Sequence, residues 1–459
     1  MIVKMRKYFG TDGIRRIANT ELSPSLVFKV AKAGAYVLSK HTDHAPTILI
    51  GRDTRISGTL IESSMIAGFL SYGANVKTLG VIPTPAVAYL TKKYNADASV
   101  VISASHNTFE FNGVKYFSNK GMKIPDSLEE EIEEIMDSDE KLLELTAVAE
   151  KIGTSENRED MINDYIDFIV GIFHESITKN KNDNFKILID TANGATYKVA
   201  EKIYKRLGIK FDIINNEPDG ININHECGST HLEMLKEKVV KEKYNLGIAY
   251  DGDGDRCLAV DENGNEIDGD VMLAIASKYL KEQGKLSKDT LVATVMSNLG
   301  LNKFTEKNDI NFKQTKVGDR YVLEEMLEKG YNLGGEQSGH IIYLDYNPTG
   351  DGILTSLMLI KILFEKNELP SNARKIINIY PQVLINAKVD SNKKYDYEND
   401  KEIKEAIEKL TKEFSGNGRV LIRPSGTEPL VRVMIEGEDQ NLITKKAEEL
   451  ADLIERKLK

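Results

Sequence analysis

Cysteine is scarce in this chain of 459 residues, and the two that occur, Cys227 and Cys257, form no CxxC pair. The sequence therefore excludes the common zinc-site spacing and a disulfide scaffold, and we expect reduced thiols in a cytoplasmic protein. No apolar run approaches the ~18 residues of a membrane span. The N-terminal segment MIVKMRKYFGTDGIRR also lacks the apolar part of a secretion signal, so we expect no membrane partner.

The chain also has fewer basic than acidic residues, 61 Lys and Arg compared with 71 Asp and Glu, which gives a net charge of −10. Nucleic-acid binding needs a basic face that neutralises phosphates, so this balance disfavours a nucleic-acid partner. The contents of hydrophobic residues, 41%, and charged residues, 29%, are typical of a globular protein. At roughly 150 residues per domain, the length predicts about three domains, with four possible.

Short apolar strands alternate with helical patterns through most of the chain, which predicts βαβ units and mainly parallel sheets. The strands are predicted at 47–50, 98–102, 186–190, 246–250 and 290–296, and helices of period 3.6 at 59–72 and 196–206. The C-terminal part changes to an α+β pattern. It has predicted strands at 383–389 and 419–422 and predicted helices at 401–414 and 441–457.

These patterns predict three similar α/β domains with mixed, mainly parallel sheets, followed by a smaller α+β domain. We place the domains at residues 1–155, 156–257, 258–370 and 371–459. The first three share a strand–turn–helix texture, so they could be copies of one unit.

Residues 251–256 read DGDGDR and directly follow the predicted strand at 246–250. In extended backbone successive side chains alternate faces, so Asp251, Asp253 and Asp255 are expected to point the same way. Clustered carboxylates repel one another unless a cation joins them, and oxygen ligands suit a hard divalent ion. The pattern therefore predicts a site for one Mg²⁺ ion.

A calcium-binding EF-hand loop is one alternative, because Glu262 stands at the twelfth position of such a loop. Two features oppose it: Arg256 occupies the sixth position, where that loop needs glycine, and the flanking segments are predicted strands. An arginine beside a metal site would suit a phosphate oxygen. A plain surface loop is the other alternative, which the cost of three unneutralised carboxylates disfavours.

A second polar loop, SASHN, follows the predicted strand at 98–102 and carries Ser105. It lacks the G-x-S-x-G pattern of α/β hydrolases, so acyl transfer is disfavoured. A serine in a turn most often only hydrogen-bonds the backbone. Near a metal site, however, a phosphoserine with a charge of roughly −1.5 to −2 would be well placed to bind the ion. Lys115 is a candidate for proton transfer or phosphate binding.

Two further loops carry groups that suit a sugar phosphate. RPSGTE at 423–428 combines an arginine, hydroxyls and backbone N–H groups, as in an anion nest, although an ordinary capped turn is the alternative. In GGEQSGH, alternation places Glu336, Ser338 and His340 on one extended face, where they would contact sugar hydroxyls; a structural histidine is the alternative for His340. The remaining candidates for substrate binding are Gly318, Asp319, Arg320, Arg423, Ser425, Gly426, Thr427 and Arg432.

The five motifs FGTDGIR, SASHN, DGDGDR, GEQSGH and RPSGTEP occur in this order. On these motifs the chain resembles the α-D-phosphohexomutase superfamily along nearly its whole length. FGTDGIR supplies Thr11, Asp12 and Arg15. Two positions depart from the family pattern, Thr108 where proline is common and Arg16 where glycine is common, but neither change removes a chemical group. KVGDRYVLE, GGEQSGH and PDGININHECGSTH resemble the branch that acts on glucosamine phosphates.

The resemblance implies four domains around a central cleft and a phosphoryl-transfer mechanism. Ser105 would carry a phosphoryl group, and Mg²⁺ would be bound by that serine with Asp251, Asp253 and Asp255, while residues 423–427 would grip the substrate's phosphate. The serine would donate its phosphoryl group to a sugar hydroxyl. The resulting sugar 1,6-bisphosphate would turn over in the cleft and return its other phosphoryl group to the serine. The residues implied to supply charge or move a proton are Arg15, Lys115, Arg256 and His340.

The implied activity is interconversion of glucosamine 6-phosphate and glucosamine 1-phosphate by a monomer or homodimer. A mutase of mannose or glucose phosphates is the first alternative, because these sugars differ only at C2, where one group gives little discrimination. A Mg²⁺-dependent sugar-phosphate phosphatase would instead release inorganic phosphate. A non-catalytic sensor is disfavoured, because Ser105 and all three aspartates are present.

Overall fold

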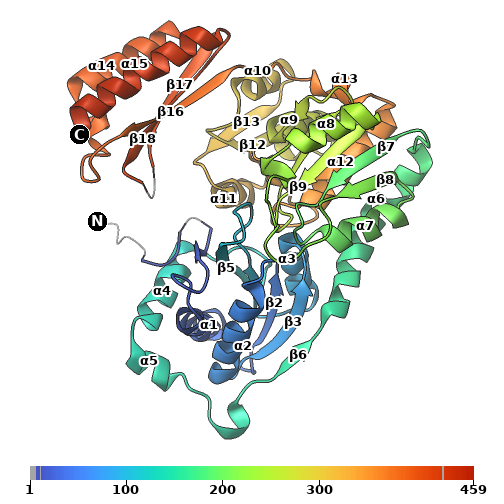
Figure 1. Ribbon diagram of the computed structural model, residues 1–459, viewed down its shortest axis with the longest axis vertical. Helices are drawn as coiled ribbons and strands as arrows, with labels where there is room; N and C mark the ends of the chain where they lie inside the picture. Colours follow the sequence, from blue (N-terminus) through green and yellow to red (C-terminus); the bar gives the residue numbers. More distant parts are fainter. Residues whose placement is uncertain (1–6, 11, 426–427) are drawn as a thin grey trace. The chain divides into compact units, whose positions relative to one another are not determined.

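The computed structural model describes residues 7–10, 12–425 and 428–459, which form two compact units. The first unit comprises Met1–Val295 and Ile310–Ile376, and its described part contains three β-sheets with flanking helices (Figure 1). The second comprises Met296–Asp309 and Ile377–Lys459 and contains one sheet in its described part. None of the described helices combines the length and apolar character that a membrane span requires.

Six strands form the first sheet, in the spatial order β1 (Ile14–Ile17), β5 (Phe111–Ser118), β4 (Ala98–Ile102), β2 (Thr47–Arg52), β3 (Asn75–Val81) and β6 (Ser155–Asn157). Its helices are α1 (Pro24–Ser39), α2 (Gly58–Tyr72), α3 (Thr84–Lys93), α4 (Asp126–Met136) and α5 (Asp139–Glu144). Strands β2, β3 and β4 are parallel, whereas β5 is antiparallel to β4. Every residue of β4 is buried, because α1, α2 and α3 all pack on it.

The second sheet has the order β11 (Glu266–Ile267), β10 (Cys257–Asp261), β9 (Leu246–Tyr250), β7 (Lys186–Asp190) and β8 (Lys210–Ile214). Its helices are α6 (Ile162–Asn180), α7 (Tyr197–Arg206) and α8 (Glu233–Glu242). Strand β7 is parallel to both β8 and β9, and β10 turns back antiparallel on β9.

The third sheet has the order β13 (Asn311–Thr315), β12 (Thr290–Thr294), β14 (Leu333–Gly335) and β15 (Ile341–Tyr343). Helices α9 (Gly269–Glu282) and α11 (Asp319–Lys329) pack on it, whereas α12 (Gly352–Lys366) and α13 (Pro370–Arg374) pack on β10 of the second sheet and on α9. Strand β12 is parallel to β13 and β14, and β15 is antiparallel to β14. Short 3₁₀ turns along the chain lie at Ala149–Lys151, Glu159–Met161, Gly228–Thr230, Ser287–Asp289 and Asp396–Glu398.

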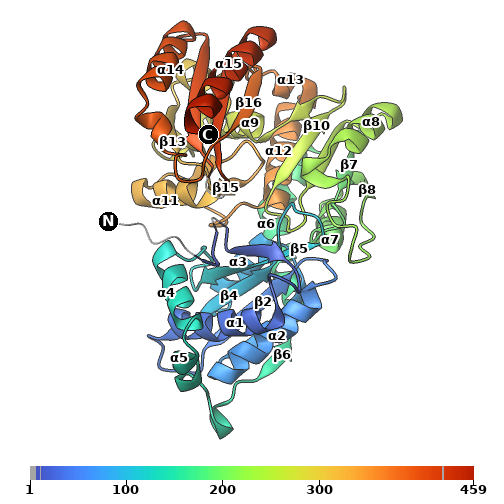
Figure 2. The same cartoon turned by 60° about the vertical axis from the view of Figure 1, so that its left-hand side comes forward.

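The second unit is an antiparallel sheet with the order β16 (Gln382–Lys388), β18 (Leu430–Gly437) and β17 (Gly418–Pro424). Its helices are α10 (Leu299–Lys307), α14 (Lys401–Glu413) and α15 (Gln440–Leu458). Helices α14 and α15 cover one face of the sheet, where Val431, Val433 and Ile435 of β18 enter the apolar core (Figure 2). The intervening residues of β18 lie on the other face, because strand side chains alternate.

Four strands of each sheet in the first unit follow one common order, namely β5-β4-β2-β3, β10-β9-β7-β8 and β15-β14-β12-β13. In each of them a parallel strand leads through a loop into an antiparallel neighbour, β4 into β5, β9 into β10 and β14 into β15. The mixed, mainly parallel sheets and the smaller α+β unit confirm the predicted fold class, and the shared order supports copies of one unit. The serine, aspartate and glutamate–histidine motifs occupy these three loops, where open α/β sheets bind ligands.

The hydrophobic pattern located most elements. Predicted strands at 98–102, 186–190 and 246–250 coincide with β4, β7 and β9, and the predicted helices at 59–72 and 196–206 match α2 and α7 within one residue. The domain boundaries near 155 and 257 fall inside sheets, because β6 pairs with β3 and because β10 and β11 extend the second sheet to Ile267.

Candidate active site

Ser105 lies in the loop after β4, here called the serine loop (residues 103–111). Its Oγ donates a hydrogen bond of 2.7 Å to Asp251 Oδ2, although 146 positions separate them in the sequence. Ser105 is buried and has a φ of 52°, a left-handed conformation that serine adopts rarely. Its backbone N–H donates to Ser103 Oγ at 2.9 Å. The His106 ring lies 3.4 Å from Ser105 Oγ, and burial with nearby arginines lowers its pKa to about 4, so the ring is neutral.

A buried arginine that the sequence analysis did not single out holds the serine loop. The Arg55 side chain is 0% exposed, and its Nε donates to Asp53 Oδ2 at 2.8 Å. Its two Nη atoms donate to four carbonyls of the loop, those of Ser105 (3.0 Å), Asn107 (2.8 Å), Thr108 and Phe111 (3.1 Å). All five guanidinium N–H donors are therefore used. Asn224 Nδ2 adds hydrogen bonds of 2.8 and 2.9 Å to two of the same carbonyls.

The three aspartates of DGDGDR converge as predicted, although through a turn and not through extended backbone. One carboxylate oxygen from each lies within 4.8 Å of the others, and all three residues are buried. Gly254 has a φ of 73° in this turn, and a Cβ on Gly252 would come within 2.5 Å of the Ser105 carbonyl oxygen. Glycine is therefore required for the two loops to approach this closely.

The donor set of this aspartate triad fits a hard divalent cation. Oδ1 of Asp253 and Oδ1 of Asp255 are buried without a hydrogen-bond partner in the described part of the chain, which is unusual for carboxylate oxygens. Burial and repulsion from the other two carboxylates raise the pKa of Asp251 well above its usual range. Burial and Asp253 likewise raise the pKa of Asp255. A cation bound to these oxygens would relieve both costs.

Lys115 of β5 neutralises part of the triad. Its Nζ lies 2.9 Å from Asp253, 3.0 Å from Asp12 and 3.9 Å from Asp255. Burial disfavours the ammonium, but these three carboxylates outweigh it and raise the pKa of Lys115. Burial also opposes ionisation of Asp253, but Lys115 and a hydrogen bond of 2.7 Å from Thr84 outweigh burial and lower the pKa of this carboxyl.

The N-terminal motif reaches the same place. Arg15 donates to Asp12 Oδ2 at 2.9 Å and to Asn107 Oδ1 at 3.0 Å, so it contacts the serine loop directly. Burial opposes the charge of Asp12, but Lys115 and the other neighbouring cations hold its pKa well below the usual range. Thr11 lies outside the described residues.

The loop 336–340 is a tight turn, so the extended geometry expected from its alternation is wrong. Strand β14 ends one residue before Glu336, whose N–H donates to His340 O at 3.0 Å, while Gly339 N donates to Glu336 O at 3.0 Å. The Glu336 carboxylate accepts a hydrogen bond of 3.1 Å from Gly318 N, which joins this turn to the 316–320 loop. Burial and the nearby Asp319 raise the pKa of Glu336.

Several polar atoms around these loops are buried without a hydrogen-bond partner among the described residues. They include Arg256 Nε, Ser338 Oγ and both ring nitrogens of His340, as well as the two triad oxygens. Such atoms are rare in folded proteins, and a cluster of them indicates a site for a polar ligand. The Arg256 backbone N–H also donates to Asp251 Oδ1 at 3.2 Å, so this residue belongs to the edge of the triad.

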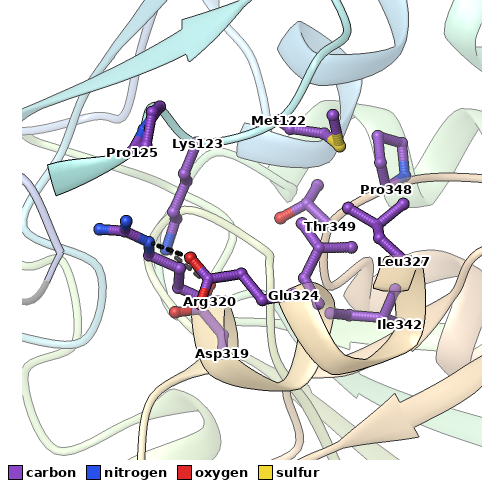
Figure 3. A pocket seen from close by; sticks show the side chains of 11 residues that line it. Met122, Lys123, Pro125, Asp319, Arg320, Glu324, Leu327, Ile342, Pro348 and Thr349 are labelled. Atoms are coloured by element: carbon purple, nitrogen blue, oxygen red, sulfur yellow. Dashed lines mark hydrogen bonds and ion pairs between the residues drawn. The ribbon is translucent and has the colours of Figure 1, made fainter. Parts of the chain in front are cut away.

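Arg320, predicted to bind substrate, contacts two protein carboxylates. It donates to Glu324 at 2.9 Å (Figure 3). It also contacts Asp126. Its neighbour Asp319 begins α11 and contacts Lys123 Nζ at 2.6 Å. Both residues border a mainly apolar cavity of about 100 Å³ between α11 and the 122–125 segment. The apolar lining makes this cavity a poor phosphate site.

The predicted phosphate loop belongs to the second unit. Arg423 of β17 and Arg432 of β18 are paired across the sheet, and paired like charges destabilise a sheet. Burial and Arg432 lower the pKa of Arg423, and the Nε atom of each arginine is buried without a hydrogen-bond partner in the described chain. Ser425, two positions after Arg423, is also buried, and the two arginines with this hydroxyl suit an anion. Gly426 and Thr427 lie outside the described residues.

Four family models match the chain in order. Three are described as phosphoglucomutase/phosphomannomutase alpha/beta/alpha domains I, II and III, and they match residues 6–143, 163–264 and 268–380. The fourth, described as the phosphoglucomutase/phosphomannomutase C-terminal domain, matches residues 384–453. Together they cover most of the chain.

Similar proteins match over the full length. A protein from Clostridium acetobutylicum named phosphoglucosamine mutase is 54% identical over 453 residues, 99% of this chain and 100% of the relative. One of the same name from Ruminiclostridium cellulolyticum is 53% identical over 454 residues, with the same two coverages. The solved structure of Aspergillus fumigatus N-acetylphosphoglucosamine mutase in complex with GlcNAc-6P and magnesium has the same fold. Its TM-score is 0.68 at 17% identity, over 99% of this chain and 96% of that chain.

Proposed function

Because this chain belongs to the phosphoglucomutase/phosphomannomutase family, we propose that it is a phosphoglucosamine mutase that interconverts glucosamine 6-phosphate and glucosamine 1-phosphate. The observation that carries the proposed chemistry is the 2.7 Å hydrogen bond from Ser105 Oγ to Asp251 inside a buried aspartate triad. The choice of amino sugar is supported by the full-length relatives at 53–54% identity. The buried free thiols of Cys227 and Cys257 support a cytoplasmic location.

In the proposed reaction Ser105 carries a phosphoryl group. The free hydroxyl of the sugar monophosphate attacks phosphorus and passes its proton to His340, while the bond from phosphorus to Ser105 Oγ breaks. Lys115, held as an ammonium by its carboxylate neighbours, would give a proton to the leaving Ser105 Oγ. The sugar 1,6-bisphosphate formed in this way turns over within the site. Its other phosphoryl group is then transferred to Ser105 Oγ, and the isomeric monophosphate leaves.

The remaining residues position the substrate and balance its charge. Mg²⁺ bound by Asp251, Asp253, Asp255 and Ser105 would supply positive charge at the phosphoryl oxygens, and the magnesium in the Aspergillus relative supports this choice of ion. Arg15 and Arg256 add positive charge near the serine loop, since both contribute to the lowered pKa of His106. The residues proposed to hold the sugar and its own phosphate are Gly318, Asp319, Glu336, Ser338, Arg423, Ser425, Gly426, Thr427 and Arg432. The four matched segments support division into four domains.

The test of this function compares kcat/KM for glucosamine 6-phosphate, mannose 1-phosphate and glucose 1-phosphate, with Mg²⁺, a trace of sugar bisphosphate and released phosphate followed in parallel. We expect the amino sugar to be preferred by about tenfold or more, the discrimination that one substituent can give. A preference for mannose or glucose phosphate would assign the chain to the other branch with its mechanism intact. Phosphate release without isomerisation would overturn the mutase proposal in favour of a phosphatase.

The aspartate triad predicts a ligand-dependent stability that needs no activity assay. At a Mg²⁺ concentration 100-fold above its Kd, the free energy of unfolding should rise by about 2.7 kcal/mol, read as a higher melting temperature. Asp251→Asn should lose this increase, yet be no less stable than the metal-free parent, because the raised pKa of Asp251 reflects a costly buried charge.

The matched control for this measurement is Asp261→Asn. Asp261 is also a buried aspartate of the second sheet, but it caps a turn by accepting from Asn263 N and Asn265 N, both at 2.9 Å. The Mg²⁺-dependent increase should persist in this variant. An increase retained by Asp251→Asn would argue against the triad as the metal site.

A further inference from the structure

Six side chains around the serine loop form a closed ring in which acidic and basic groups alternate. The successive contacts are Asp12–Lys115 (3.0 Å), Lys115–Asp255 (3.9 Å), Asp255–His340 (3.8 Å), His340–Asp319 (3.4 Å), Asp319–Lys123 (2.6 Å) and Lys123–Asp12 (2.5 Å). Two members, Lys115 and His340, are the groups proposed to move the proton. Lys123 has no part in the proposed mechanism, yet the ring closes only through it.

Lys123 joins elements from two different sheets. It follows β5 of the first sheet and extends toward the start of α11, where Asp319 and Arg320 lie (Figure 3). Its side chain is 14% exposed. Its Nζ contacts Asp12 from the part of the chain that forms the first sheet and Asp319 from the part that forms the third sheet, across the boundary between these two sheets. Burial disfavours the ammonium, but Asp12 and Asp319 outweigh it and raise the pKa of Lys123. The lysine therefore remains a cation between two anions.

The contacts of each neighbour show what Lys123 controls. Asp12 also holds Lys115 and Arg15, so a movement of Asp12 changes the position of the ammonium beside the triad. Asp319 is a close carboxylate neighbour of the His340 ring. Without Lys123, two carboxylates would face each other with no cation between them and would separate. The neighbouring cation Arg320 is held by Asp126 and Glu324 on the outer side.

We propose that Lys123 is a positioning residue that fixes Lys115 and His340 relative to each other by bridging Asp12 and Asp319. This inference rests on the proposed function, since it concerns the two groups assigned to proton movement. Lys123 acts through the two aspartates and touches neither the phosphoryl group nor the sugar in this assignment. Its removal therefore lowers kcat through Lys115 and His340, and it changes KM only to a smaller extent through Asp319, which is also proposed to hold the sugar.

The first test is Lys123→Met, which keeps the length of the side chain and removes its charge. We expect kcat to fall by about 100-fold, the cost of a displacement near 1 Å in a catalytic group, with KM changed by less than about threefold. Lys123→Arg should recover kcat to within about tenfold of the parent, because a guanidinium can bind both carboxylates.

Asp126→Asn is the matched control, because it removes a carboxylate that contacts Arg320 across the same boundary and leaves the ring intact. Its kcat should stay within about twofold of the parent, as expected for a half-exposed ion pair. If Asp126→Asn and Lys123→Met lower kcat equally, general loosening of the boundary explains the loss and the positioning role is overturned. An unchanged kcat in Lys123→Met would overturn it as well.

Two further measurements separate positioning from folding. The loss of kcat in the double variant Lys123→Met/Asp319→Asn should be close to that of Lys123→Met alone, because contacting members of one network are not additive. The loss of Asp319 as a proposed sugar contact should appear in KM. The imidazole ¹⁵N signals of His340 should also shift in Lys123→Met and return toward the parent in Lys123→Arg. Unchanged signals would overturn the proposal. This spectrum keeps its meaning if the parent isomerises none of the three sugars, a result that would instead overturn the proposed function.

Discussion

Replacement of Ser105 by alanine is expected to lower the rate of isomerisation by about 10⁴-fold or more, because it removes the atom proposed to carry the phosphoryl group. The backbone of the serine loop should persist in this variant, because Arg55 and Asn224 bind the loop through its backbone carbonyls. The Ser105 side chain takes no part in these hydrogen bonds. The Kd of the sugar phosphate should therefore change by less than about threefold. Isomerisation kinetics measure the rate, and calorimetric titration measures the Kd. Transfer of ³²P from a labelled sugar bisphosphate shows whether the protein still accepts a phosphoryl group.

Ser103→Ala is the natural companion to that experiment. It removes a neighbouring hydroxyl that donates to Asp53 at 2.6 Å and accepts from Ser105 N at 2.9 Å, but it leaves the proposed nucleophile in place. We expect a loss of about tenfold, as for one positioning hydrogen bond of about 1.4 kcal/mol, with the ³²P label retained. Full activity of Ser105→Ala, or a label retained by it, would contradict the nucleophile assignment.

Arg55→Lys is expected to have the second largest effect. A lysine presents its donors from a single nitrogen and cannot reach the four carbonyls and the carboxylate that Arg55 binds together. Several of these buried acceptors then lose their donor, and the free energy of unfolding should fall by about 3–5 kcal/mol, since each unpaired buried acceptor costs about 1–3 kcal/mol. The left-handed conformation of Ser105 also loses its support, so phosphorylation of Ser105 should slow by about 100-fold.

Arg52→Lys provides the control for this substitution, because Arg52 precedes Arg55 by three positions and is 23% exposed, with a contact of 3.0 Å to Glu62. Its replacement should cost less than about 1 kcal/mol and leave phosphorylation unchanged. Urea denaturation gives the stabilities, and amide hydrogen exchange of residues 103–111 reports the loop. Equal effects of the two substitutions, or unaltered exchange in Arg55→Lys, would show that Arg55 does not hold the serine loop.

A strand or helix could be predicted from the sequence where the apolar pattern within the segment itself reflects its burial. The apolar run at 98–102 predicts β4 because the strand is buried on both faces, and in helix 59–72 the buried residues Ile61, Met65 and Phe69 recur at helical spacing. The domain boundary near 257 was harder to predict, because β10 belongs to the second sheet only through its pairing with β9. Such pairing is a tertiary property that no local pattern contains.

In the candidate site, too, residues that are neighbours in sequence could be predicted, whereas residues with distant partners could not. The aspartate triad could be found because its members are neighbours in sequence and their repulsion requires a cation. Arg55 and Lys123 could not be found, because their function lies in partners 50 to 196 positions away. The same holds for the protein contacts of Arg320: its position in a glycine turn suggests a ligand, but it does not reveal the contacts with Asp126 and Glu324.

The long separations within the site also have a consequence for the newly made protein. Ser105 and Asp251 are 146 positions apart, and Lys123 and Asp319 are 196 apart. At about 5–20 residues per second of synthesis, the serine loop therefore exists for on the order of 10 s before the carboxylate that binds its hydroxyl. During that interval the nascent chain holds a nucleophile without its acidic partner, and the proposed proton-transfer groups are not yet joined. Activity begins only after the third sheet has been made and has docked.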